Sequence, residues 1–183
     1  MSKIYLIRHG RTPANEQHLY CGSTDLELSE NGVAALKELH YEIQPQRILT
    51  SGMKRTEQTL KVLFGDVEHE IDPRFREVDF GIFEMGSYEQ LKDDPRYQQW
   101  ISGDNEANVP PEGESGHQMT RRVLAALEDV SRDSRDTLIV THGGVIAAIM
   151  AELFPREGKN RYQWQPKPGH GYWIFEGKFG ILP

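Results

Sequence analysis

Short runs of consecutive apolar residues recur along the chain and are separated by longer amphipathic segments. The clearest runs span residues 3–9 (KIYLIRH), 47–51 (RILTS) and 136–144 (DTLIVTHGG). Runs this continuous are typical of strands that are covered on both faces of a sheet, because neither side of the strand is left for solvent. We expect a further strand at 66–72 and a terminal hairpin at 169–182.

The segments between these runs have the periodicity of helices. They cover residues 28–43, 53–65, 114–132 and 145–154. Ser29 is a suitable N-cap for the first helix, and Gly65 is a suitable stop for the second. In the third, apolar side chains recur every three or four residues and share one face of the helix: Met119, Val123, Leu124, Leu127 and Val130.

The order of these elements predicts the fold class. Strands that alternate with helices form a mostly parallel central sheet with helices on both faces, that is, a three-layer α/β/α sandwich. The 183 residues are enough for one domain of ordinary size. Residues 77–114 are rich in Gly, Pro and acidic residues. We expect this long segment, which has only weak helix signals, to form a lid over the edge of the sheet.

Charge and composition narrow the class of ligand. The formal net charge is −7, so the chain lacks the broad basic surface with which proteins bind nucleic acid nonspecifically. No apolar run approaches the roughly 20 residues that cross a bilayer, and the amino terminus does not resemble a secretory signal. With a single cysteine, Cys21, no internal disulfide can form. We therefore expect a cytoplasmic protein with no nucleic-acid or membrane partner.

Two of the predicted strands end in the same way, one at Arg8 and His9 and the other at His142 and Gly143. Ligands of open α/β sheets bind at the carboxyl ends of the strands, so the two histidines should face one pocket if the strands are neighbours. Gly143 lets a helix begin there, with free N–H groups directed at an anion. Arg8, together with Arg55 in the first turns of the helix at 53–65, could bind the same anion.

The same residues leave two questions open. Paired histidines also bind metals, but the adjacent arginines would repel a cation and no metal-binding spacing is present. We therefore expect neither a metal nor a cofactor. Three carboxylates in the stretch FREVDFGIFE, namely Glu77, Asp79 and Glu84, are candidates for a general acid, and the stretch itself does not distinguish them.

Four stretches occur in an order and at a spacing that identify a family. They are LIRHGRTPAN, TSGMKRTEQT, REVDFGIFE and VTHGG, and together they resemble the histidine phosphatase superfamily over nearly the whole chain. The resemblance implies a phosphoglycerate mutase-like fold and a nucleophilic histidine, His9. It also implies a phosphate pocket formed by Arg8, Asn15, Arg55 and His142, and a proton donor at Glu77.

Chemical reasoning agrees with these implied roles. Two arginines can neutralise the oxygens of a phosphoryl group in the transition state without a metal, because each presents a planar fork of donors. Their charge should also lower the pKa of His9, which keeps a ring nitrogen free to attack phosphorus. The attack gives a phosphohistidine that water then hydrolyses. The expected partner is therefore a small phosphorylated substrate.

The superfamily contains mutases as well as phosphatases. Thr12 and the stretch THGGVI resemble the small phosphatases, and the chain is short for a mutase. One phosphatase branch of this size removes the 5′-phosphate of α-ribazole phosphate, but the similar loop CGSTDLELSENG is shared with other branches and does not name a substrate. The alternatives are a phosphoglycerate mutase, a phosphoprotein phosphatase and a noncatalytic module that binds phosphorylated ligands.

Overall fold

The computed structural model describes residues 2–183 and contains a six-stranded sheet in the order β3-β2-β4-β1-β5-β6. The strands are β1 (Ile4–Arg8), β2 (Arg47–Thr50), β3 (Glu70–Ile71), β4 (Thr137–Thr141), β5 (Gly171–Phe175) and β6 (Lys178–Leu182). Strands β1 to β4 pair in parallel, whereas β5 and β6 form the antiparallel terminal hairpin. The predicted, mostly parallel sheet is confirmed.

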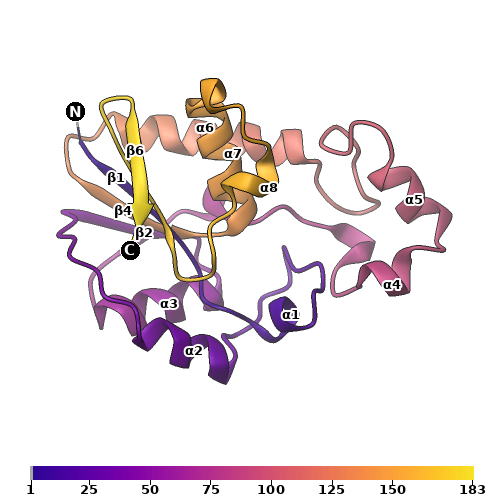
Figure 1. Ribbon diagram of the computed structural model, residues 1–183, viewed down its shortest axis with the longest axis horizontal. Helices are drawn as coiled ribbons and strands as arrows, with labels where there is room; N and C mark the ends of the chain where they lie inside the picture. The colour runs from indigo at the N-terminus through magenta and orange to yellow at the C-terminus, as the bar shows by residue number, and fades with distance from the viewer. Residues whose placement is uncertain (1) are drawn as a thin grey trace.

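Helices cover both faces of this sheet (Figure 1). Helices α2 (Glu30–Lys37) and α3 (Lys54–Phe64) lie on one side, and α6 (Gly116–Ser131) and α7 (Gly143–Leu153) lie on the other. The remaining helices are short: α1 (Pro13–Glu16), α4 (Tyr88–Leu91), α5 (Pro95–Ile101) and α8 (Arg161–Trp164). The three-layer α/β/α sandwich expected from the element order is therefore present.

Successive side chains of the central strands point to opposite faces of the sheet, and this divides the core into two parts. Leu6 of β1 and Ile139 of β4 pack with the apolar faces of α6 and α7. Their neighbours Ile7 and Val140 belong to a second cluster with Leu60 of α3. Because successive side chains of a strand point to opposite faces, a strand buried on both sides needs apolar residues at every position, which explains the continuous runs in the sequence.

Two of the predicted elements are shorter than expected. The helix predicted for 28–43 begins after the N-cap Ser29, as expected, but it ends at Lys37. Tyr41 and Ile43 leave the helix because they pack from a loop against the second core cluster. The strand predicted for 66–72 is reduced to Glu70–Ile71, at an edge of the sheet where only β2 is available for pairing.

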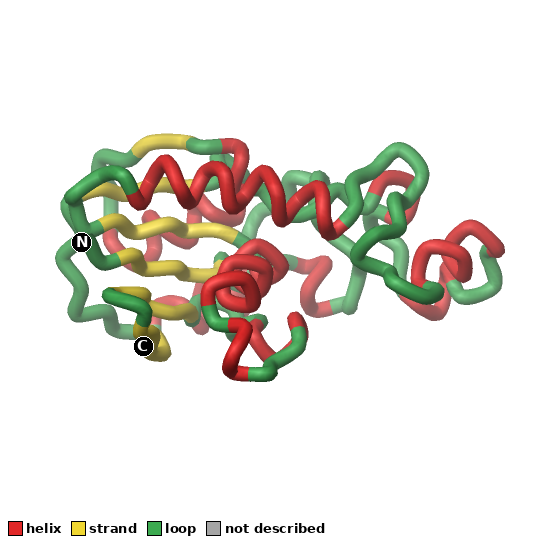
Figure 2. The backbone as a smooth tube through the Cα atoms, turned by 90° about the horizontal axis from the view of Figure 1, so that it is seen from above, coloured by secondary structure: helices red, strands yellow, loops and turns green. Residues whose placement is uncertain are grey.

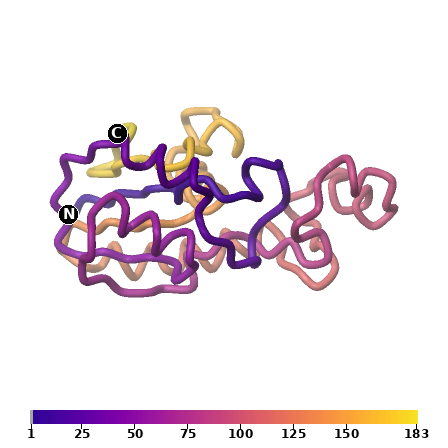
Figure 3. Tube along the Cα trace, turned by 90° about the horizontal axis from the view of Figure 1, so that it is seen from below, coloured from indigo at the N-terminus to yellow at the C-terminus, as the bar shows by residue number. Residues whose placement is uncertain are grey.

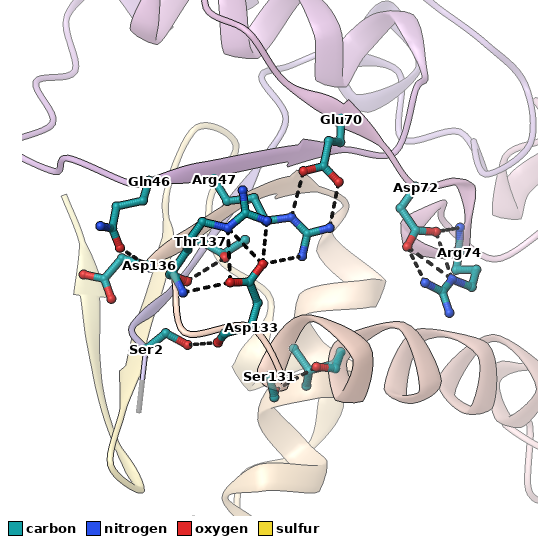
Figure 4. Close-up of polar contacts among 12 residues, drawn as sticks. Ser2, Gln46, Arg47, Glu70, Asp72, Arg74, Ser131, Asp133, Asp136 and Thr137 are labelled. Atoms are coloured by element: carbon teal, nitrogen blue, oxygen red, sulfur yellow. Dashed lines mark hydrogen bonds and ion pairs between the residues drawn. The ribbon is translucent and has the colours of Figure 1, made fainter.

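Polar contacts join the amino ends of the strands (Figure 4). The guanidinium of Arg47, at the start of β2, forms ion pairs with Glu70 at 2.7 Å and with Asp133 at 3.6 Å. The backbone N–H of Asp136 donates to Oε1 of Gln46 at 3.0 Å. These contacts involve the end of the sheet opposite to the two histidines, so the charged residues there have structural partners of their own.

The segment 77–114 forms a lobe beyond the carboxyl ends of the strands, on the side away from both termini (Figure 2). It contains α4 and α5, and the view from below shows the loop before α2 running back beneath it (Figure 3). A cluster of aromatic rings packs in and against the lobe, with centroid distances of 5.1 to 6.2 Å: Tyr20, Phe80, Phe83, Tyr97, Trp100 and, at its exposed edge, Tyr88.

Burial predicts how two isoleucines differ in their contribution to stability. Ile139 in the centre of the sheet is fully buried, whereas Ile71 on the edge strand is 58% exposed. Ile139→Ala should lower the free energy of unfolding by about 2–5 kcal/mol, because it leaves a cavity in the core. The matched change Ile71→Ala should stay within roughly 0.5 kcal/mol. Urea unfolding followed by circular dichroism measures both, and equal losses would contradict the two-sided core.

Candidate active site

The two histidines lie side by side at the carboxyl edge of the sheet. Strands β1 and β4 are adjacent and parallel, with Arg8 opposite Thr141. The residue after each strand therefore reaches the same place, and the rings of His9 and His142 lie 5.1 Å apart between centroids at an angle of 64°. Both side chains are buried. The structure brings these two residues together as the sequence pattern predicts for neighbouring strands.

The surroundings of His9 determine which ring nitrogen is free. Its Nδ1 lies 2.6 Å from the carbonyl oxygen of Gly10, and a carbonyl can only accept, so Nδ1 carries the proton. In the neutral ring, Nε2 then keeps its lone pair. Burial, followed by the charges of Arg55 and Arg8, holds the pKa of His9 well below its usual range. The ring is therefore neutral and can act as a nucleophile through Nε2.

His142 is held by a chain of buried hydrogen bonds. The Nε–H of Arg55 donates to its Nδ1 at 3.3 Å, so its proton lies on Nε2, which donates to Oγ of Ser51 at 2.8 Å. The Ser51 hydroxyl in turn lies 3.1 Å from Oγ1 of Thr56, which donates to the carbonyl of Met53 at 2.8 Å. Each direction follows from the fixed donor at Arg55. Burial and the charge of Arg55 lower the pKa of His142 well below its usual range.

The two arginines beside these rings are held mainly by backbone carbonyls. Arg55 is 1% exposed and donates to the carbonyls of Thr24 at 2.8 Å and Gly22 at 2.7 Å. With the bond to His142, these contacts use three of the five guanidinium N–H groups, so two remain for a ligand. Arg8 donates to the carbonyl of Pro166 at 2.8 Å, and its buried Nε has no partner among residues 2–183.

The start of α7 completes a site with donors on several sides. A Cβ atom on Gly143 would lie 3.0 Å from Cζ of Arg8, so glycine there leaves room for the guanidinium to lie against the helix terminus. The N–H of Gly143 has no hydrogen-bond partner within residues 2–183. Free N–H groups and the positive end of the helix dipole favour an anion at this point.

Asn15 lies on the short helix α1, which follows β1. Its Oδ1 accepts from the backbone N–H of Thr12 at 3.0 Å and from the Thr12 hydroxyl at 3.1 Å, so the two residues form a capping box. The Nδ2 of Asn15 forms no hydrogen bond with another of residues 2–183 and can therefore donate to a ligand. The structure does not bring Asn15 into contact with either histidine.

The structure separates the three candidate acids. Glu84 accepts hydrogen bonds from the backbone N–H groups of Gly22, Ser23, Thr24 and Phe80 and from the Thr24 hydroxyl. Asp79 accepts from the Ser23 hydroxyl and from the N–H of Gly81, both at 2.9 Å. These two carboxylates therefore hold loops. In particular, Glu84 orders the loop whose carbonyls bind Arg55.

Glu77 differs from the other two acids because it lines a cavity. One of its oxygens, Oε2, accepts from the N–H of Gly144 in the first turn of α7 at 2.9 Å. Its Oε1 accepts from its own neighbour, Val78, at 3.0 Å. The cavity has a volume of about 380 Å³ and lies between the 77–114 lobe and α8. Glu77 is thus placed between the start of α7 and the space in which a substrate could lie.

Several residues of this region were not singled out from the sequence. Arg122 of α6 pairs with Glu114 and donates to the carbonyls of residues 74, 76 and 77, which fixes the backbone that carries Glu77. Ser51 and Thr56 orient His142, as described above. Arg161 of α8 pairs with Glu106 of the lobe. Ser51 and Thr56 lie within the family motif TSGMKRTEQT, but their partners depend on the folded chain and leave no local signal.

Residues 2–183 contain neither a clustered set of metal ligands nor a membrane-spanning helix. No group of three or more His, Cys, Asp and Glu side chains is arranged to hold a metal ion. No helix in that part of the chain combines the length and the apolar character needed to cross a bilayer.

Comparison with known proteins gives relatives over most of the chain. The adenosylcobalamin/alpha-ribazole phosphatase of Salmonella typhimurium is 32% identical over 176 residues, which is 91% of this chain and 87% of that protein. A Yersinia pestis protein named probable phosphoglycerate mutase GpmB is 30% identical over 165 residues, covering 84% of this chain and 75% of its own length.

Solved structures agree with the sequence relatives. One match is the crystal structure of an Escherichia coli protein with the proposed activity of an alpha-ribazole-5′-P phosphatase. It has a TM-score of 0.83 and 25% identity, and the match covers 98% of this chain and 94% of that one. The family model described as histidine phosphatase superfamily (branch 1) matches residues 4–174. The chain therefore belongs to branch 1 of the histidine phosphatase superfamily.

Proposed function

We propose that this protein is a phosphomonoesterase that works without a metal, with His9 as nucleophile and Glu77 as general acid. The observation that carries the proposal is the neutral ring of His9, whose free Nε2 is surrounded by donors suited to a phosphoryl group. The relative named as a phosphatase has higher identity and coverage than the one named as a mutase, which supports hydrolysis rather than phosphoryl shift.

The reaction would proceed in two displacements. In the first, Nε2 of His9 forms a bond to phosphorus while the bond between phosphorus and the ester oxygen breaks, and Glu77 gives its proton to the departing oxygen. In the second, Glu77 takes a proton from water, whose oxygen attacks phosphorus and displaces the histidine. Arg8, Arg55, Asn15 and the N–H of Gly143 would stabilise the charge on the phosphoryl oxygens in both steps. His142, expected from the family resemblance to bind phosphate, has both ring nitrogens engaged by Arg55 and Ser51 and would act by orienting Arg55.

The substrate that the relatives favour is α-ribazole 5′-phosphate. Both the Salmonella typhimurium relative and the Escherichia coli structure carry this activity in their names. The loop CGSTDLELSENG is shared with other branches and does not select the substrate, but its folded form holds Arg55 through the carbonyls of Gly22 and Thr24. We further propose that the 77–114 segment acts as a lid, because it supplies most of the lining of the cavity beside Glu77.

Replacement of the nucleophile gives the first test of the proposal. His9→Ala should abolish hydrolysis of phosphomonoesters in the presence of a chelator, because the neighbouring His142 has both ring nitrogens engaged by Arg55 and Ser51. Rapid quenching of the wild type with labelled substrate should trap acid-labile, alkali-stable phosphate that the variant does not form. A variant that keeps near wild-type rates, or activity that requires an added divalent ion, would overturn the mechanism.

Substrates with different leaving groups test which carboxylate is the general acid. Glu77→Gln should slow an alkyl phosphate by about 10²–10⁴-fold, because an alkoxide must be protonated as it leaves. It should slow p-nitrophenyl phosphate much less, because p-nitrophenolate leaves readily without a proton. Asp79→Asn and Glu84→Gln serve as matched controls, and each should affect both substrates alike through its loop. A leaving-group-dependent loss in either control would transfer the role to that carboxylate.

The lowered pKa of His9 predicts its titration. In the unfolded chain a histidine binds a proton near pH 6.5, whereas His9 in the folded protein should stay neutral as the pH falls through that value. Arg55→Gln removes one cause of the lowered pKa and should bring the titration of His9 closer to pH 6.5. NMR of the labelled imidazole measures the titration of His9 in the wild type and in the variant. A wild-type His9 that titrates at the usual pH would contradict the prediction.

The lowered pKa of His9 also makes the free energy of unfolding depend on pH. Below about pH 6.5 the unfolded chain binds a proton that the folded His9 does not, so the contribution of this residue to the free energy of unfolding falls as the pH decreases.

A further inference from the structure

The cavity beside Glu77 has flat aromatic walls. Tyr20, Phe80, Tyr97 and Trp100 line it, and the ring of Trp100 contacts those of Tyr20 and Phe80 at centroid distances of 5.4 and 5.9 Å. The hydroxyls of Tyr20 and Tyr97 are 2.7 Å apart and form a hydrogen bond with each other, so the rings present mainly apolar surface to the cavity. Surfaces of this kind favour a planar ring, which can stack or pack edge-to-face on them.

Three carboxylates and a single cation line the same cavity. The acidic residues are Glu77, Glu106 and Glu114, and Arg161 is the one lysine or arginine among the described residues that line it. Nη1 of Arg161 contacts both oxygens of Glu106, with 2.5 Å to Oε1. Glu114 is paired through its two oxygens with Arg122, each at 2.8 Å. Arg161 and Arg122 therefore each already have a carboxylate partner.

Glycines at two helix starts leave room for this charge cluster. A Cβ atom on Gly144 of α7 would lie 2.9 Å from Nη2 of Arg161, and one on Gly116 of α6 would lie 3.1 Å from Nη1. The guanidinium is thus held between two helix termini and lies near both Glu77 and Glu106. A second anion on the substrate would face these carboxylates without a free cation. Even when Glu77 carries the proton that it donates, Arg161 and Arg122 stay paired with Glu106 and Glu114.

We infer that this cavity selects the alcohol part of the substrate by charge, accepting a planar group that is neutral or cationic and rejecting one that carries a second anion. The inference rests on the proposed function, because it assumes that the phosphoryl group lies at His9. It separates this protein from enzymes whose substrates carry a carboxylate or a second phosphate. Glu106 and Arg161 are then specificity-determining residues, since they set the charge of the cavity wall.

A pair of substrates of equal shape tests the inference in the wild type. In 4-carbamoylphenyl phosphate and 4-carboxyphenyl phosphate, an amide and a carboxylate occupy the same position of the same ring. The carbamoyl compound should have a kcat/KM at least about tenfold higher, which corresponds to about 1.4 kcal/mol. Equal values, or a preference for the carboxylate, would overturn the inference. This comparison needs no variant and is therefore independent of any effect on folding.

Two substitutions should move this preference in opposite directions. Glu106→Gln frees the charge of Arg161 and should reduce the ratio of the two kcat/KM values, whereas Arg161→Gln leaves Glu106 unpaired and should increase it. If the two residues had only a structural role, the kcat/KM values of both substrates would fall together and their ratio would stay unchanged. Glu112→Gln is the matched control, because Glu112 is an exposed acid of the same lobe that does not line the cavity. An unchanged ratio in both cavity variants would overturn the role of the pair.

The proposed function and this inference fail in different ways. If p-nitrophenyl phosphate is not hydrolysed at all, the phosphatase assignment fails and the inference falls with it. If p-nitrophenyl phosphate is hydrolysed through a trapped phosphohistidine but carboxylated and carbamoylated substrates react alike, the proposed function stands and selection by charge is wrong.

Discussion

Burial of the Arg55 guanidinium is the constraint on which the site depends. A cation taken out of water is costly unless its donors are satisfied, and the protein satisfies this one without an adjacent carboxylate. The carbonyls of Gly22 and Thr24 bind its outer nitrogens, and a ring nitrogen of His142 accepts from its Nε. Because no anion neutralises it directly, the charge stays available to a ligand and acts on both histidines.

Several other features follow from this arrangement. The donor at Arg55 determines the tautomer of His142 and so the direction of the hydrogen bonds through Ser51 and Thr56. The same charge, together with that of Arg8 and with burial, keeps the pKa of His9 low. The carbonyls that bind Arg55 belong to a loop that is itself ordered by Glu84. One carboxylate of the lobe thus supports the site around Arg55 and the two histidines from outside, while another, Glu77, is left facing the cavity.

The lobe and α7 are closely packed beside the site. Phe83 is 1% exposed and packs its ring 5.3 Å from Trp100 and 5.4 Å from Tyr97, within the aromatic cluster. Met85 has a φ of 62°, a conformation that glycine adopts more easily. Ala147 of α7 is fully buried in the core cluster that contains Leu6 and Ile139.

Much of the fold and of the pocket could be predicted from the sequence. The apolar runs predicted the buried strands, and the N-cap Ser29 and the stop at Gly65 predicted helix ends. The repeated strand ending predicted that His9 and His142 would meet if their strands were neighbours, and the structure supplied that condition. These features depend on local periodicity, on backbone preference and on the rule that parallel neighbours end at one edge. Each is encoded within a few residues, so a single chain without its structure is enough to read them.

The tertiary structure decided what depends on partners distant in sequence. It showed that the helix from Ser29 ends at Lys37, because the residues after it gain more from packing in the core than from continuing the helix. It showed that Glu77 lines the cavity, whereas Asp79 and Glu84 accept hydrogen bonds from the loop at residues 22–24, more than fifty residues away. It also paired Arg161 with Glu106 across the cavity. A carboxylate has the same sequence signature whether it holds a loop or faces a ligand, because only its folded surroundings determine which donors reach it.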